Sequence, residues 1–208
     1  MAVTIKSDRE IQLMREAGII LAKTHEELEK ALHACMTTYE VNKIGDEILR
    51  SFGCVPSFLN YHGYPASICV SVNEEVVHGI PSKKRILKDG DVVSLDAGVI
   101  WKGYHSDAAR THIIGEGSEK AKELVKVTRE CFYEGIKYAI AGNHLNDICK
   151  AIGAYAKDRG YGVVRDLVGH GIGTHLHEDP EVPNFDMKRG GIKLQPGMTL
   201  AIEPMITA

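Results

Sequence analysis

A repeat within the chain limits the folds that this sequence can adopt more than any other feature. The segment LKDGDVVSLDAG, from Leu87, matches LQPGMTLAIEPM, from Leu194, at a constant offset of 107 residues. In both copies a glycine turn precedes an apolar strand, and an acidic residue, Asp96 or Glu203, ends that strand. A glycine turn before a strand is common, but a buried carboxylate without a partner is costly, so the matched acids favour a shared role. The repeat predicts two copies of one supersecondary unit.

The order of helix and strand patterns is also the same in both halves. Helical spacing of apolar residues follows Ser7–Glu10 and Thr37–Glu40, and each start fits a capping box. Period-two and glycine-rich patterns indicate strands and turns in between. The expected helices run from Ser7 to about Cys35, from Thr37 to about Gly53, over 118–141 and over 143–159. The expected strands lie over 67–77, with a hairpin turn at Asn73–Glu74, over 91–114 and from Val163 onward. We therefore expect an α+β fold, with residues 1–208 as a single domain whose halves are about 1–115 and 116–208.

The spacing of Asp96 and Asp107 predicts a hairpin with two acidic side chains on it. On one straight strand, their odd separation would place them on opposite faces of a sheet. If the chain reverses at the break formed by Trp101, Lys102 and Gly103, the two carboxylates return to facing positions. Two carboxylates in facing positions on neighbouring strands repel each other unless they share a proton or bind a cation, and hard divalent metals are the usual partners.

His170 supplies a second type of metal ligand. It lies between two glycines in GHGIGTHLHEDP, residues 169–180, close to two further histidines. A lone histidine is more often a packing or surface residue, but this context favours a site. With Asp96, Asp107 and Glu203 it makes an oxygen-rich set with one nitrogen, which suits Mn, Fe, Co or Zn better than it suits a structural zinc site.

Composition excludes several other classes of protein. The formal charge of -3 and the pI near 6.4 give no basic field for nucleic acid, and Lys83–Arg85 is the one short basic cluster. No apolar run approaches the roughly 20 residues that a membrane-spanning helix needs. Five cysteines, without CxxC pairs or a secretory segment, indicate a reducing compartment. We expect a cytoplasmic protein that binds neither nucleic acid nor membranes.

Four motifs together resemble the type I methionine aminopeptidases. They are NEEVVHGIP at 73–81, the hairpin of Asp96 and Asp107, GHGIG with HEDP within 169–180, and AIEP at 201–204. They occur in order and at fitting spacing along nearly the whole chain. The resemblance implies the pseudo-two-fold "pita-bread" fold, an antiparallel sheet with helices on its outer face. It also implies a dinuclear metal site that removes the N-terminal methionine from nascent proteins and peptides whose second residue is small.

The resemblance implies roles for individual residues as well. Asp96 is expected to be a terminal ligand of one metal, Asp107 to bridge both, and His170 and Glu203 to bind the other. Glu203 is also expected to take the proton of the attacking water, and His78 and His177 to face the scissile peptide. The implied substrate-binding residues are Tyr61, His62, Tyr64, Cys69, His78, Leu176 and His177. N-terminal peptides are the implied partners, and Lys83–Arg85 is a candidate contact with the ribosome.

The chain departs from the family pattern at its end. The pattern has a fifth ligand, a glutamate that bridges both metals from a strand after Glu203, and the repeat places it at position 214 or later, whereas the chain ends at Ala208. We therefore expect a C-terminally truncated form with its last strands missing. The expected cofactor is two divalent ions (Co, Mn, Fe or Zn), or only one in this form.

Two alternatives remain open at this point. A proline-specific aminopeptidase would share the fold and the ligands, but such enzymes usually carry a large extra N-terminal domain, and here the first helix starts by Ser7. A non-catalytic peptide-binding fragment is the other alternative, because the fifth metal ligand is absent. Loss of ligands by substitution would mark that class, and four of the five are present.

Overall fold

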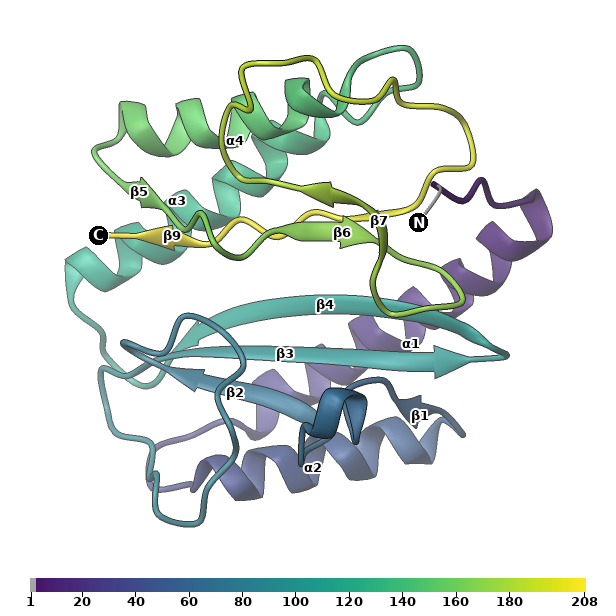
Figure 1. The fold of residues 1–208 in the computed structure, drawn as a ribbon. Helices are drawn as coiled ribbons and strands as arrows, with labels where there is room; N and C mark the ends of the chain where they lie inside the picture. Colours follow the sequence, from purple (N-terminus) through teal and green to yellow (C-terminus); the bar gives the residue numbers. More distant parts are fainter. Residues whose placement is uncertain (1–2) are drawn as a thin grey trace. The chain divides into compact units, whose positions relative to one another are not determined.

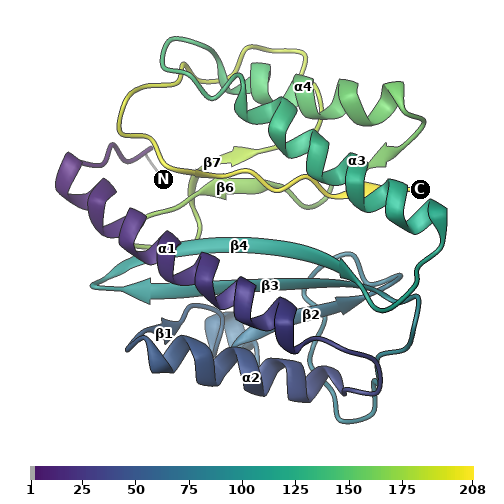
Figure 2. The ribbon, with the colours of Figure 1, turned by 180° about the vertical axis from the view of Figure 1, so that it is seen from behind.

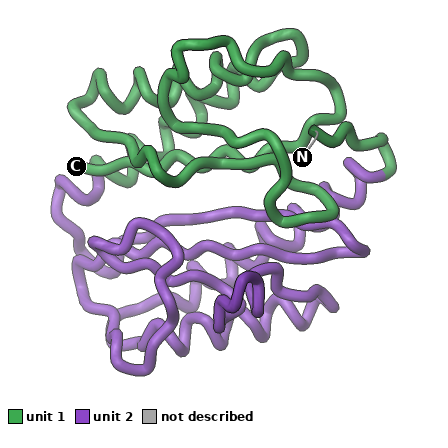
Figure 3. Tube along the Cα trace, in the orientation of Figure 1, with its two compact units in different colours: residues 1–9, 123–208 green, residues 10–122 purple. Residues whose placement is uncertain are grey.

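We analysed a computed structural model, which describes residues 3–208. The chain divides into two compact units, drawn in different colours in Figure 3. The first unit, purple and numbered 2 in Figure 3, is Glu10–Lys122. The second unit, green and numbered 1 there, combines Met1–Arg9 with Glu123–Ala208. No helix in the described part of the chain has the length and apolar composition needed to span a bilayer.

The first unit is an antiparallel sheet with two helices on one face. The helices are α1 (Asp8–Ala31) and α2 (Thr38–Ser51), and a short 3-10 turn, η1, covers Tyr61–Gly63. Strand β3 (Val92–Trp101) pairs with β4 (Tyr104–Ile113) along one edge and with β1 (Val55–Pro56) and β2 (Ile68–Val72) along the other. Figure 1 shows α1 behind these strands, and Figure 2, seen from the opposite side, shows α1 in front of them.

Alternation along β3 decides which side chains enter the core. Val93, Leu95, Ala97 and Val99 are fully buried, and they pack in the cluster that contains the inner residues of both helices. Successive strand residues point to opposite faces, so Asp96 points away from the helices. The strand that buries the core therefore also presents the first candidate ligand on its other face.

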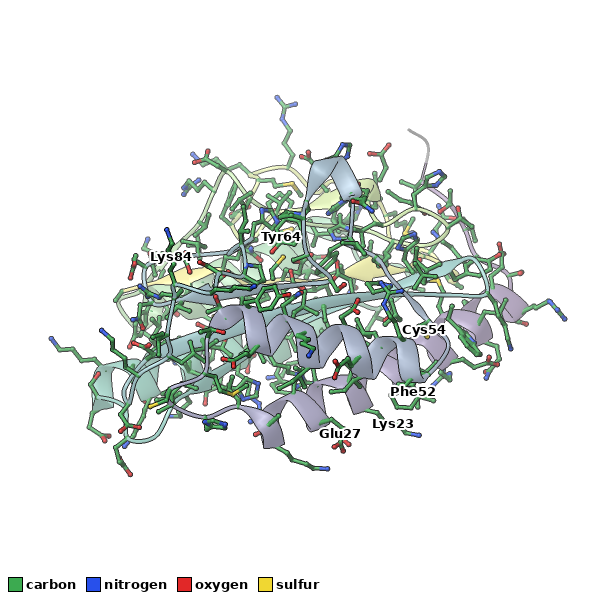
Figure 4. The ribbon with its side chains drawn as sticks, turned by 90° about the horizontal axis from the view of Figure 1, so that it is seen from below. Lys23, Glu27, Phe52, Cys54, Tyr64 and Lys84 are labelled. Carbon is green, nitrogen blue, oxygen red and sulfur yellow. The ribbon has the colours of Figure 1, made fainter. Side chains whose placement is uncertain are left out.

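Helix α1 is amphipathic, as its sequence pattern predicts. Ala17, Leu21 and Leu28 are buried against the sheet, whereas Lys23 and Glu27 lie on the outer side of the helix (Figure 4). The helix ends at Ala31 and not near Cys35. The N–H of Cys35 bonds to the carbonyl of Leu87 at 2.9 Å, and its φ of 71° is not helical. The bond to the strand region thus ends the helix earlier than periodicity alone suggests.

The capping box predicted before α2 is confirmed. The hydroxyl of Thr37 accepts from the N–H of Glu40 at 3.2 Å, and the carboxylate of Glu40 accepts from the N–H of Thr37 at 2.7 Å. The turn predicted at Asn73–Glu74 is present, but it does not form a hairpin, because no strand directly follows it and β2, which ends at Val72, pairs with β3. The side chain of Asn73 instead bonds to Asp91 and to the N–H of Val92, which ties the turn to the start of β3.

The second unit contains two helices and two small antiparallel sheets. The helices are α3 (Glu119–Ile136), whose first turn belongs to the first unit, and α4 (Leu145–Asp158). Helix α3 ends before the expected Ala141, because tight turns, such as the bond from Tyr138 N–H to the Gly135 carbonyl, replace its last turn. One sheet pairs β5 (Gly162–Val163) with β9 (Ile206–Thr207), and the other has the order β7 (Glu178–Val182), β6 (Gly169–Gly171), β8 (Leu200–Ala201).

The repeat in the sequence extends to the hydrogen-bonding pattern of both units. Helices α2 and α4 have the same length and lie 107 residues apart in the chain. The same offset relates the isolated bridge Thr37↔Ile86 of the first unit to His144↔Lys193 of the second. It also relates the strand pair Val55↔Ile100 to Gly162↔Thr207. The turn glycines Gly90 (φ 87°) and Gly197 (φ 90°) correspond in the same way. The two units therefore share one pattern of helix, cap and strand pairing.

His25 on α1 predicts how stability depends on pH. It is 4% exposed, its Nε2–H donates to the carbonyl of Ala108 at 2.8 Å, and burial lowers its pKa from 6.5 to about 4. The His25 ring therefore binds a second proton more tightly in the unfolded chain than in the folded chain. We expect the free energy of unfolding to fall by about 3 kcal/mol from pH 6.5 to pH 4 on this account, at about 1.36 kcal/mol per pKa unit.

Urea unfolding curves across this pH range test the expectation. A His25→Gln variant should lose less stability than the parent over the same interval, because it has no proton to bind. The exposed His33 offers a matched control, since His33→Gln should follow the parent curve. Equal acid sensitivity of the parent and His25→Gln would contradict the assignment.

Candidate functional site

The hairpin of β3 and β4 places Asp96 and Asp107 on one face of the sheet. The register pairs Asp96 with Ala109 and Gly98 with Asp107, so the two aspartates are diagonal neighbours. The prediction that they face each other directly is wrong. The turn contains only Lys102 and Gly103, both with positive φ, which sets the register two residues away from the expected one. Diagonal partners lie about 7–8 Å apart at their Cα atoms, a span that cations between them can bridge.

Cys69 and Tyr64 lie beside this pair, as the sequence predicts. Cys69 on β2 is opposite Asp96 in the register, and burial followed by the charge of Asp96 raises its pKa to about 12. Tyr64 donates its hydroxyl to the carbonyl of Gly79 at 2.8 Å, and burial raises its pKa far above the usual range. Figure 4 shows Tyr64 on the other side of the sheet from α1. This face of the first unit therefore combines two carboxylates with a neutral, partly apolar wall.

The remaining predicted residues of the first unit lie in turns. Tyr61 and His62 belong to η1, where their rings meet edge to face with centroids 4.4 Å apart. His78 is exposed and has a φ of 59°. The next residue, Gly79, is held against β2, and a Cβ there would lie 2.3 Å from the carbonyl oxygen of Val70. Glycine at this position is thus required for the turn that presents His78.

The two ring nitrogens of His170, in the second unit, have contacts that suit a metal-binding histidine. Its Nδ1 lies 2.8 Å from the carbonyl oxygen of Gly171, and an oxygen of this kind can only accept, so Nδ1 carries the proton. In the neutral ring, Nε2 then holds a lone pair, and it points to Oε1 of Glu203 at 3.1 Å. Two acceptors at this distance need a proton or a metal ion between them. A backbone carbonyl that fixes the second nitrogen is also typical of metal-binding histidines.

Glu203 lies between β8 and β9, and its backbone is fixed by a residue that the sequence motifs do not include. The side chain of Asn184, which is fully buried, donates to the carbonyl of Glu203 at 2.7 Å. Among the described residues, Oε1 of Glu203 is buried without a hydrogen-bond partner, although it lies 3.1 Å from Nε2 of His170. This oxygen and the His170 ring fit a divalent cation.

His177 and Leu176 lie in the loop between β6 and β7. The ring of His177 meets that of His170 edge to face, with centroids 4.2 Å apart. His177 is exposed, whereas Leu176 is buried. The structure thus brings His170, His177 and Glu203 together within the second unit, and Asp96, Asp107, Tyr64 and Cys69 within the first.

The family assignment follows from comparison with known proteins. Residues 12–208 match the sequence profile of Metallopeptidase family M24. This chain belongs to metallopeptidase family M24. Within it, the chain groups with the methionine aminopeptidases. It is 52% identical to the methionine aminopeptidase of Clostridium acetobutylicum, over 98% of this chain and 82% of that protein. It is 47% identical to methionine aminopeptidase 1 of Bacillus subtilis, over 99% of this chain and 83% of that protein.

Solved structures agree with this assignment and with the predicted pita-bread fold. Methionine aminopeptidase from Thermotoga maritima matches with a TM-score of 0.96 and 43% identity, over 99% of this chain and 82% of that one. The Xaa-Pro dipeptidase from Bacillus anthracis matches less well, with a TM-score of 0.81 and 30% identity, over 96% of this chain and 54% of that one. The chain is therefore an M24 hydrolase of the methionine aminopeptidase group, and the predicted α+β class is confirmed.

Thiol reactivity tests the placement of Cys69 in this M24 chain. Cys35 is exposed, and the other four cysteines are buried, with burial raising the pKa of Cys69 to about 12 and of Cys131 and Cys149 to about 11. The thiolate is the reactive form, so these buried thiols should be inert. We expect Ellman's reagent to modify one thiol in the native protein and five after denaturation. Rapid modification of a native Cys35→Ser variant would contradict this arrangement.

Proposed function

We propose that this protein removes the N-terminal methionine from nascent proteins and peptides whose second residue is small. The observation that carries the proposal is the pairing of His170 Nε2 with a buried carboxylate oxygen of Glu203, in a chain that belongs to the methionine aminopeptidases. Proteins related to this chain at about half identity carry that name. The cytosol, where nascent chains emerge, is the proposed location.

The proposed metal ligands are Asp96, Asp107, His170 and Glu203. Their oxygen-rich composition favours divalent Co, Mn, Fe or Zn, and we propose that one or two such ions bind. A bound divalent ion lowers the pKa of water and polarises the substrate carbonyl. Asp96 and Asp107 would hold the metal from one face of β3 and β4, where they are diagonal neighbours.

The protein's own groups supply proton transfer and orientation in this proposal. Glu203 takes the proton of the attacking water at its carboxylate, for which the buried Oε1 without a hydrogen-bond partner is suited. His177 donates to the carbonyl oxygen as negative charge develops there, and His78 faces the peptide that is cut. The proposed pocket for the methionine side chain is formed by Tyr61, His62, Tyr64, Cys69 and Leu176.

A contact between Lys83–Arg85 and the ribosome remains a prediction. Lys83 Nζ lies 4.9 Å from the centroid of the Tyr39 ring, and Nη2 of Arg85 lies 3.9 Å from Oε1 of Glu74. Two of the three positive charges therefore already have partners in the first unit. Co-sedimentation with ribosomes at low and high salt, with Lys84→Glu as the variant, tests this contact. Salt-independent binding, or unchanged binding of Lys84→Glu, counts against it.

A peptide assay tests the proposed function against both alternatives. We expect the protein with added Mn or Co to release methionine from Met-Ala-Ser and to leave a Gly-Pro bond intact, and Asp96→Ala to lose the activity. Cleavage of the Gly-Pro bond alone would assign the proline-specific activity. Binding of Met-Ala-Ser without hydrolysis, at every metal tested, would assign a non-catalytic peptide-binding protein.

A further inference from the structure

The segment around Lys6 packs on the loop that carries Leu176 and His177. Both belong to the second unit. Lys6 is only 8% exposed, and its Nζ donates to Oε2 of Glu178 at 2.6 Å. The hydroxyl of Thr4 donates to the same oxygen, and the N–H of His175 donates to Oε1 at 3.1 Å. The carboxylate of Glu178 therefore joins a segment near the start of the chain to the loop between β6 and β7.

The Glu178 carboxylate is ionised in this setting. Burial alone would raise its pKa, but the hydrogen bonds from Lys6, Thr4 and His175 outweigh burial and lower the pKa to about 2. The ion pair is thus fully formed at neutral pH. Both of its side chains are almost entirely excluded from solvent. A buried ion pair adds little stability over an apolar pair of similar volume, but removing one partner leaves a charge that has no compensation.

Lys6 fits into this site because two of the residues next to it are glycines, which have no side chain. A Cβ at Gly173 would lie 2.5 Å from Cε of Lys6 and 2.6 Å from Oε1 of Glu178. A Cβ at Gly197 would lie 2.7 Å from the Lys6 carbonyl oxygen, and the Gly197 carbonyl accepts from the N–H of Lys6 at 2.8 Å. The Lys6 backbone and side chain are therefore both held by the second unit, which makes this segment a fixed part of it.

The anchored loop carries two residues of the proposed site. Glu178 directly follows Leu176 and His177 in the chain, and it pairs with Gly171, the neighbour of His170, in the register of β6 and β7. Through Glu178, the ion pair fixes the end of the loop beside the His170 ring. We infer that Lys6 and Thr4 are positioning residues, which hold His177 and Leu176 in place for the reaction proposed above.

A double-mutant cycle tests this inference, which rests on the proposed function. In Lys6→Met, we expect kcat for Met-Ala-Ser to fall about 10- to 100-fold, because a displacement of about 1 Å in a catalytic group costs up to about 10²-fold. KM should change by less than a factor of about 3. In the His177→Ala background, the same Lys6→Met change should have little further effect on kcat, because the group that Lys6 positions is absent. Lys30→Met, which breaks an exposed ion pair with Glu27, should match the parent.

The outcomes separate the inference from the proposed function. If His177→Ala lowers kcat but Lys6→Met does not, or if the two changes act independently, the positioning role is overturned. If the parent shows no release of methionine, the proposed function fails, and the histidine Cε1–H NMR signals then decide the inference. The His177 signal should shift in Lys6→Met and not in Lys30→Met, and an unmoved signal overturns it. Thr4→Val provides a milder variant if Lys6→Met does not fold, and it should shift the same signal.

Discussion

Replacing His170 by alanine should lower kcat/KM for Met-Ala-Ser by more than about 100-fold, the upper range for loss of a residue that only supports a metal ligand. The ring is buried, its Nδ1 is committed to the Gly171 carbonyl, and its Nε2 faces Glu203. Titration calorimetry should show that affinity for Mn or Co falls in the same variant.

The neighbouring His175 provides a matched control for this change. It lies in the same loop region, but it is exposed, and its ring contacts the surface residue Thr174. His175→Ala should retain both the activity and the metal affinity of the parent. If His170→Ala and His175→Ala behave alike, the assignment of His170 as a ligand is wrong.

Replacing Gly169 by alanine should have the second large effect, on stability and activity together. A Cβ at this position would lie 2.3 Å from the carbonyl oxygen of Ala201, so β6 and β8 would have to separate. Overpacking of this kind costs about 1–3 kcal/mol, and the Ala201 backbone together with the Cβ of Val182 leaves little room for relaxation. The same separation would move His170 away from Glu203, so kcat should fall by about 10²-fold.

Gly18 on α1 is the contrasting position. A Cβ there would meet only Ser106 Oγ, at an ordinary distance of 3.7 Å. Gly18→Ala should therefore stabilise the protein by about 0.5–1 kcal/mol, because glycine is unfavourable within a helix. Chemical unfolding and the peptide assay on both variants check these expectations. A Gly169→Ala variant as stable and active as Gly18→Ala would show that β6 tolerates a side chain beside His170.

Local patterns in the sequence predicted the parts of the fold that depend on near neighbours. The cap of α2, the inner faces of α1 and α2, the hairpin of β3 and β4, and the offset between the two units all follow from spacing and turn residues. The face that Asp96 and Asp107 share was predictable for the same reason. Their register was not, because it depends on whether Trp101 belongs to the turn, and the structure pairs Trp101 with Tyr104.

Contacts between residues far apart in the chain could not be predicted from these local patterns. Asn184 supports the Glu203 carbonyl, and Lys6 pairs with Glu178, but neither pair has a spacing or motif that marks it in advance. The early end of α1 has the same origin, because the bond from Cys35 to Leu87 joins distant segments. The sequence thus identified the candidate ligands, whereas their supporting residues required the structure.

Anomalous diffraction from crystals grown with Mn tests the central claim most directly. We predict a strong anomalous peak at the proposed ligands Asp96, Asp107, His170 and Glu203, and its loss in the His170→Ala variant. A Mn peak away from these residues, or no peak at His170 and Glu203, would contradict the proposed metal site.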